Sequence, residues 1–142
     1  MVAACQRKGE DCIYLVPKNF EGNLLLVFEQ KDGSDILYEE KTRMYKFDTI
    51  GVLKTKFAPN NGLHRKTYYY VDSVRARFLI KYVVSSQLNE SDEVVCINHE
   101  AGNDFDKKIS APRHFELMTI AKGKHIDSIG KHRDFFSFKK LE

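Results

Sequence analysis

The sequence predicts an all-β fold, and three observations carry that prediction. Short apolar runs recur through residues 43–82, each closed by a polar or Gly/Asn turn such as Ala58-Pro-Asn-Asn-Gly62. Residues 75–82 largely alternate, since Ile80 and Tyr82 point one way and Arg77 and Lys81 the other, as in a half-buried strand. Leu24–Phe28 is apolar at every position, which is typical of a strand covered on both faces.

We therefore expect an antiparallel β-sandwich of about eight or nine strands with at most one short helix, since two packed sheets bury many short strands well. An open β-barrel is the alternative. The expected strands comprise residues 12–16, 23–30, 43–47, 52–57, 66–71, 75–82, 93–98, 114–120 and 134–138. Residues 124–133 are expected to form the helix, because Ile126 and Ile129 are three apart. Residues 1–11 read as a flexible segment and residues 12–142 as one domain.

The charge balance argues against a nucleic-acid partner. The chain has 23 basic and 20 acidic residues, a net charge of +3, and both signs are spread along it. The longest apolar run, Leu24–Phe28, is far shorter than the roughly 18 residues of a membrane span. Any contact with a membrane is therefore expected only through a lipid anchor.

The cysteines suggest such an anchor. Val2-Ala-Ala-Cys5 resembles the end of a bacterial lipoprotein signal, in which small residues precede the lipidated cysteine, so Cys5 is the candidate lipidation site. An ordinary flexible N-terminus is the alternative. Cys12 and Cys96 then remain, and they can form a disulfide in an oxidising compartment or lie as free thiols in buried strands.

Part of the chain resembles a known group of proteins. The residues that carry the resemblance are Tyr14-Leu-Val-Pro-Lys-Asn-Phe-Glu-Gly22, Leu26-Val-Phe-Glu-Gln30 with Asp32-Gly33, Tyr45-Lys-Phe-Asp-Thr-Ile-Gly-Val-Leu-Lys-Thr55 and Tyr69-Tyr-Val-Asp72. Over residues 12–80 the chain resembles a family of small, uncharacterised, exported bacterial lipoproteins of the Bacteroidetes type. The resemblance implies a cell-envelope location and brings no catalytic motif with it.

The aromatic strand 66–71 is the candidate binding surface. Tyr68 and Tyr70 share one face, and Tyr69 and Val71 share the other. An outward pair offers rings to a ligand or partner protein, and we take Tyr68 and Tyr70 as that candidate. A strand packed on both faces is the alternative, because Tyr is favoured in strands.

The polar residues of the second half form no recognised catalytic or metal site. The cluster Asn98–Asp106 has oxygen and imidazole groups but lacks the spacing of a calcium loop, and we expect a solvated loop there. His114 and Glu116 share a strand face, which could orient an imidazole for acid–base chemistry, but we expect an exposed sheet face there. The spacings of His114, His125 and His132 match no zinc site, and His125–Asp127 is no more specific.

We therefore predict a domain that acts by binding a protein or ligand, without a cofactor or metal. A hydrolase-like enzyme that uses second-half histidines such as His99 or His114 is one alternative. A nucleophilic Cys96 is disfavoured, because a thiol in an apolar strand is normally inert. A small inhibitor or immunity-type protein that binds one protein partner is the other alternative.

Overall fold

The computed structural model describes residues 8–84, 89–106 and 111–130, and at residues 99–106, 111–113 and 130 it describes the backbone alone. The strands are β1 (Cys12–Pro17), β2 (Gly22–Val27), β3 (Tyr38–Glu39), β4 (Thr42–Lys46), β5 (Val52–Lys54), β6 (Lys66–Val71), β7 (Arg77–Tyr82), β8 (Val94–Asp106) and β9 (Ala111–Lys122). A 3-10 turn (Gly123–His125) and helix α1 (Ile126–Gly130) follow β9.

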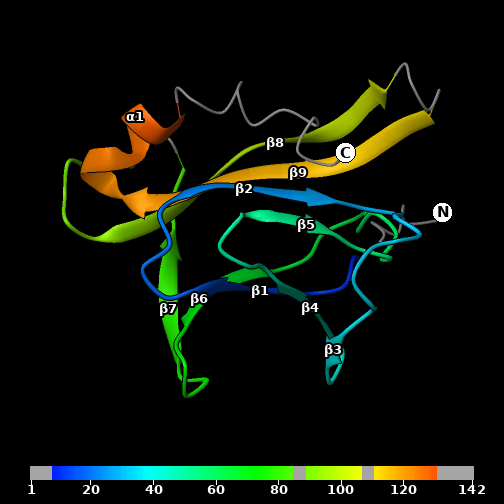
Figure 1. The fold of residues 1–142 in the computed structure, drawn as a ribbon, viewed down its shortest axis with the longest axis horizontal. Helices are drawn as coiled ribbons and strands as arrows, with labels where there is room; N and C mark the ends of the chain where they lie inside the picture. The colour runs from blue at the N-terminus through cyan, green and yellow to red at the C-terminus, as the bar shows by residue number, and fades with distance from the viewer. Residues whose placement is uncertain (1–7, 85–88, 107–110, 131–142) are drawn as a thin grey trace, which may run out of the picture.

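The strands form a single curled sheet. Its order is β3-β4-β1-β6-β7-β8-β9-β2-β5. Strands β4, β1 and β6 lie in one half, β8, β9, β2 and β5 lie over them in the other, and β7 stands at the turn between the halves (Figure 1). The all-β class is confirmed. The curled sheet is a half-barrel, which agrees with the open-barrel alternative and not with two separate sheets.

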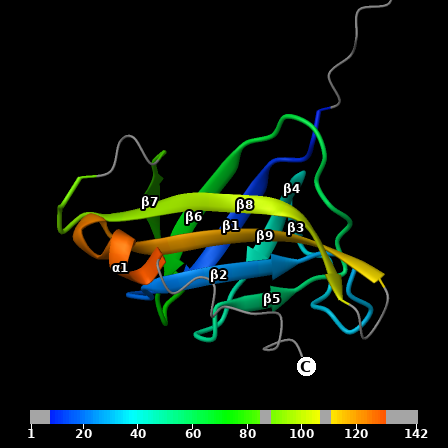
Figure 2. The same cartoon turned by 90° about the horizontal axis from the view of Figure 1, so that it is seen from above.

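The expectation of purely antiparallel pairing was wrong for part of the sheet. Strand β1 pairs in parallel with both β4 and β6, β2 pairs in parallel with β5, and β7 with β8. For the pairs that β1 forms with β4 and β6 and β2 forms with β5, the reason is the path of the chain, which alternates between the two halves from β1 to β6 (Figure 2). Sheet neighbours are therefore separated by segments of the opposite half and can run in the same direction.

Most expected strands are present, with shifted ends. Residues 66–71 match β6, and β1, β2, β4 and β7 overlap their expected ranges. Strand β5 ends at Lys54, and Thr55 continues only as an isolated bridge to Ser34. The two-residue strand β3 was not expected. Three expectations lie outside the described residues: the strand 134–138, the helix residues 131–133, and residues 1–7 of the segment that was expected to be flexible.

The loop expected at Asn98–Asp106 is instead the outer part of β8. Strand β8 pairs antiparallel with β9. The pairing runs from Val94 opposite Lys122 to Asp106 opposite Ala111, with one irregularity near Asn98. This long ladder pairs the backbone polar groups of residues whose composition alone favours a loop. The prediction of a loop, which relied on the polar residue types of this segment, was therefore wrong.

The core lies between the two halves of the sheet. Its largest fully buried side chains include Tyr14, Leu24, Leu26, Tyr45, Tyr68, Met118 and Ile120. Leu25 and Val27 point to the opposite side of β2 and are also buried, with Leu117, so the prediction that both faces of this strand are covered is confirmed. Helix α1 places Ile126 against Val95 and Ala121 on the other side of β8 and β9.

Truncating Leu26 to alanine should destabilise the protein strongly. Leu26 has 0% exposure in the main core, and a buried Leu→Ala change costs about 2–5 kcal/mol through lost burial and the cavity left behind. Leu63→Ala, at a leucine with 67% exposure, is the matched control and should change stability by less than about 0.5 kcal/mol. Urea unfolding measures both, and an equal effect of the two changes would contradict this core.

Candidate functional site

A row of aromatic rings crosses the interior of the half-barrel. Because β1 is in parallel register with β4 and β6, Tyr14 is paired with Tyr45 on one side and with Tyr68 on the other. The ring centroids are 5.1 Å apart for Tyr14–Tyr45 and 4.6 Å apart for Tyr14–Tyr68. The row continues to Phe57 beyond Tyr45 and to Tyr82 beyond Tyr68.

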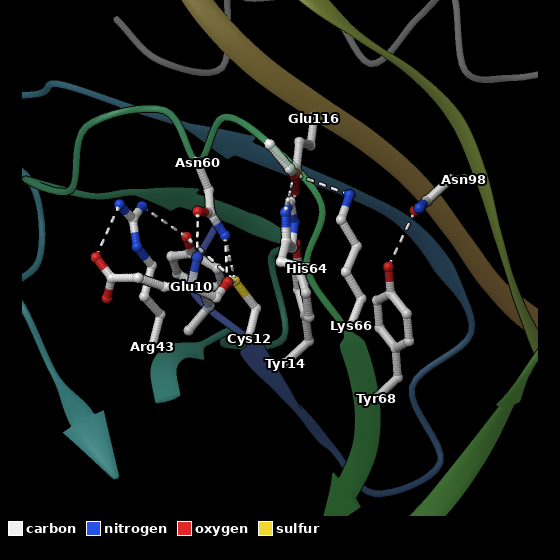
Figure 3. A network of polar contacts seen from close by, with 12 residues as sticks. Glu10, Cys12, Tyr14, Arg43, Asn60, His64, Lys66, Tyr68, Asn98 and Glu116 are labelled. Carbon is white, nitrogen blue, oxygen red and sulfur yellow. Dashed lines mark hydrogen bonds and ion pairs between the residues drawn. The ribbon is translucent and has the colours of Figure 1, made fainter. Parts of the chain in front are cut away.

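Each buried tyrosine hydroxyl in this row has a polar partner. Tyr14 donates to Glu116 Oε2 at 2.6 Å, and Tyr68 donates to Asn98 Oδ1 at 3.1 Å (Figure 3). The Tyr45 hydroxyl accepts from Arg43 Nη1 at 3.2 Å. Burial raises the pKa of all three phenols above its ordinary value, so they remain protonated donors at neutral pH.

An ion pair lies beside the row. Lys66 Nζ is 3.0 Å from Glu116 Oε1, while Tyr14 holds the other carboxylate oxygen (Figure 3). Glu116 is only 8% exposed, and the lysine side chain is about one quarter exposed. The carboxylate therefore has one neutral and one charged donor, the arrangement that a buried charge requires.

A second polar group closes the other end of the interior. The buried Arg43 donates to Ala58 O at 2.6 Å and lies over the ring of Phe57. The side chain of Asn60 forms two hydrogen bonds with the backbone of Glu10, at 2.9 and 2.6 Å, and its Nδ2 donates to Cys12 Sγ at 3.1 Å. Residues just before β1 are thus fastened to the loop after β5.

A cleft opens where β8 separates from β7. In the described chain the two strands are paired only at Lys81–Val95 and Tyr82–Cys96, so β7 has an open edge before that point. The cleft has a volume of about 680 Å³. Its lining includes Lys66, Tyr68, Tyr70, Ile80, Tyr82 and Glu93. Charged, aromatic and aliphatic groups meet there.

The structure places Tyr68 and Tyr70 on the inward face of β6. They are 1% and 9% exposed, so they do not form an outward aromatic surface. Both nevertheless line the cleft, and Tyr70 donates to Phe20 O. Burial raises the pKa of Tyr70 to about 12. The exposed ring of this region is Tyr82 on β7, which sequence reasoning placed on the same face as Ile80.

Cys12 and Cys96 are both buried and free in the structure, which is the second of the two possibilities left open above. They belong to strands in opposite halves of the sheet, β1 and β8. Burial raises the pKa of both thiols, which keeps them protonated and poorly nucleophilic. The candidate lipidation site, Cys5, lies outside the described residues.

The histidines are distributed over separate places. His114 and Glu116 do share a face of β9, as expected, but Glu116 is buried rather than solvated, and both line a pocket of about 260 Å³. His125 contacts Glu21 Oε1 at 3.0 Å near the surface instead of pairing with Asp127. The side chains of His99 and His132 lie outside the described residues.

Sequence reasoning missed His64, Lys66 and the role of Glu116. His64 places Nδ1 2.8 Å from Gly62 O, and its Nε2 is buried with no hydrogen-bond partner among the described residues. For Lys66 and Glu116, the alternation of side chains along their strands could have predicted their positions. Lys66 is in phase with Tyr68 and Tyr70, and Glu116 is in phase with Met118 and Ile120. Opposite charges on two otherwise apolar strand faces indicate a pair.

Two kinds of feature are absent from the described residues. No group of three or more His, Cys, Asp or Glu side chains gathers there closely enough to hold a metal ion. Among the helices of the described ranges, none has the length and apolar character needed to cross a membrane.

Comparisons with known proteins find one family and one solved structure. The model of a family of unknown function, DUF6843, matches residues 8–124. A crystal structure of a Bacillus anthracis protein provisionally designated a lipoprotein has a similar fold, with a TM-score of 0.62 and 21% identity over 79% of this chain and 70% of that one. No curated protein matches the sequence.

The buried tyrosines should make the fold sensitive to alkali. Their folded-state pKa values are raised above the ordinary value of 10.0, so the folded state keeps protons that the unfolded chain loses. Their contribution to stability is complete below about pH 10 and is lost as the pH rises further. We expect tyrosinate absorbance from Tyr14, Tyr45 and Tyr68 to appear only together with unfolding, followed by circular dichroism. A titration in concentrated guanidinium chloride is the control, and buried rings that ionise before the fold is lost would contradict the burial.

Proposed function

This chain belongs to the DUF6843 family of unknown function, and we propose that it is a binding domain of the cell envelope that takes its ligand in the cleft between β6, β7 and β8. One observation carries the proposal. The cleft joins a partly exposed aromatic ring, Tyr82, to a lysine, Lys66, whose position is set by a buried carboxylate. Concave sites with an apolar wall and a few placed polar groups are the usual form of ligand sites.

The chemistry of the interior favours binding over catalysis. Burial holds the phenols of Tyr14 and Tyr68 and the thiol of Cys96 in their protonated forms, so none of them is an activated base or nucleophile. Glu116 is engaged by two donors. These groups do not form a nucleophile–base pair.

The envelope location rests on two independent supports. The residues Val2-Ala-Ala-Cys5 resemble the end of a lipoprotein signal, and the similar structure belongs to a protein provisionally designated a lipoprotein. We propose that Cys5 carries the lipid, which would tether the β-domain to a membrane without any membrane-spanning segment.

Substituting Tyr82 should weaken binding of an apolar probe. Nile red, a neutral planar dye that brightens in apolar sites, should bind the wild-type protein and bind Tyr82→Ala roughly 2- to 10-fold more weakly, because one stacking surface is removed. Tyr38→Ala is the matched control, since Tyr38 and Tyr82 are 47% and 46% exposed and Tyr38 lies outside the cleft. An equal loss in both variants, or no loss in Tyr82→Ala, would show that the dye does not bind in the cleft.

Lipidation can be tested on the full-length gene. A bacterium that expresses the wild-type protein should incorporate a labelled fatty acid into it, and Cys5→Ser should abolish the label and release the protein from the membrane fraction. Cys12→Ser is the control, because Cys12 is buried in β1. Equal labelling of the Cys5→Ser protein would exclude Cys5 as the lipid-bearing residue.

A further inference from the structure

The aromatic row of the interior ends at a ring that is open to the cleft. Tyr82 lies 6.1 Å from Tyr68 between ring centroids, at an interplanar angle of 11°, and is 46% exposed. Offset-stacked rings at such distances attract one another beyond the burial of their surface. A planar ring that enters the cleft can therefore extend the row by one member.

A positioned cation lies near this open ring. Continuing the antiparallel β6–β7 register by two residues beyond the Tyr68–Ile80 pair places Lys66 opposite Tyr82 on the same face of the sheet. An ammonium group has three N–H donors, and Glu116 accepts one of them at 3.0 Å. Tyr14 holds Glu116 in turn at 2.6 Å (Figure 3), so the position of Lys66 is fixed before any ligand arrives.

The charged side chains of the cleft balance once Glu116, the partner of Lys66, is counted, so an anion would be bound through the further N–H donors of Lys66 and not through a net positive charge. Lys66 and Lys81 are the cationic side chains in its lining, and Glu93 is the anionic one. The volume of about 680 Å³ is within the range of roughly 300–1,000 Å³ that small-molecule sites occupy.

We infer that the cleft takes a small molecule with a planar aromatic ring and a carboxylate, the ring stacking on Tyr82 and the carboxylate accepting hydrogen bonds from Lys66. This inference rests on the proposed binding function and adds the class of ligand to it. It also gives a reason for the charged pair within an aromatic interior. A buried ion pair adds little to stability compared with apolar side chains of similar volume. A lysine that has further N–H donors for a ligand can instead select between ligands.

The test compares two probes of the same shape, one with a carboxylate and one with a neutral amide. Isothermal titration calorimetry with naphthoate and with its neutral amide, naphthamide, should show naphthoate binding the wild-type protein at least about tenfold more tightly, as a charge-assisted hydrogen bond provides. Cyclohexanecarboxylate, which has the charge without the aromatic ring, should bind more weakly than naphthoate.

Three variants assign the preference to Lys66. In the double variant Lys66→Gln with Glu116→Gln, which leaves no unpaired buried charge, the preference for naphthoate should disappear. In Glu116→Gln alone, naphthoate should bind several-fold more tightly than to the wild-type protein, because the ligand no longer competes with the protein's carboxylate. Lys56→Gln, at a lysine paired with Asp35 away from the cleft, should leave the preference unchanged. Melting temperatures verify that each variant is folded.

The outcomes separate this inference from the proposed function. Equal affinity for naphthoate and naphthamide, or no binding of either while Nile red still depends on Tyr82, overturns the ligand class and leaves the cleft as a binding site. A preference for naphthoate that survives in the double variant also overturns the inference, since the anion would then bind elsewhere. If Nile red binds Tyr82→Ala as tightly as the wild-type protein, the proposed function and the inference both fail.

Discussion

The parallel pairing of β1 with β4 and β6 is the constraint on which the rest of the molecule depends. It places Tyr14 between Tyr45 and Tyr68 and brings three phenol rings side by side in the interior. Rings of this size bury a large apolar area, but every hydroxyl needs a polar partner once it leaves water. Glu116 and Asn98 supply two of these partners from β9 and β8, in the opposite half of the sheet. The tyrosine row therefore ties the two halves together by both packing and hydrogen bonds.

The same row explains the charge within the core. The Glu116 carboxylate that accepts the hydrogen bond of Tyr14 is buried, and a buried carboxylate requires a cation. Lys66 at the start of β6 provides that cation. An apolar side chain at both positions would pack without that electrostatic cost. The ion pair leaves the lysine in the wall of the cleft, and this lysine distinguishes the cleft from an ordinary packing gap.

The cleft exists because the sheet does not close smoothly at β7. Strand β7 follows β6 over four register pairs but meets β8 at only two, and Tyr82, the last ring of the row, stacks on Tyr68 yet stays 46% exposed. The core and the candidate site are thus one continuous structure. Rigidity from the buried tyrosines positions the site, while the missing strand contact gives access to it.

The sequence by itself determined the local structure of this protein. Alternation and turn residues were sufficient for β6 at its observed bounds, for the inward phase of Ile80 on β7 and for the shared face of His114 and Glu116, because side chains alternate within any strand. The tertiary structure alone decided which face is inside and which strands are neighbours. Tyr68 and Tyr70 proved to be core residues, Glu116 proved to be buried, and Asn98–Asp106 became a strand, because each outcome depends on a partner strand distant in sequence. Alternation is a property of one strand, whereas parallel pairing, the tyrosine row and the Lys66–Glu116 contact depend on how separate strands meet, and no single segment contains that information.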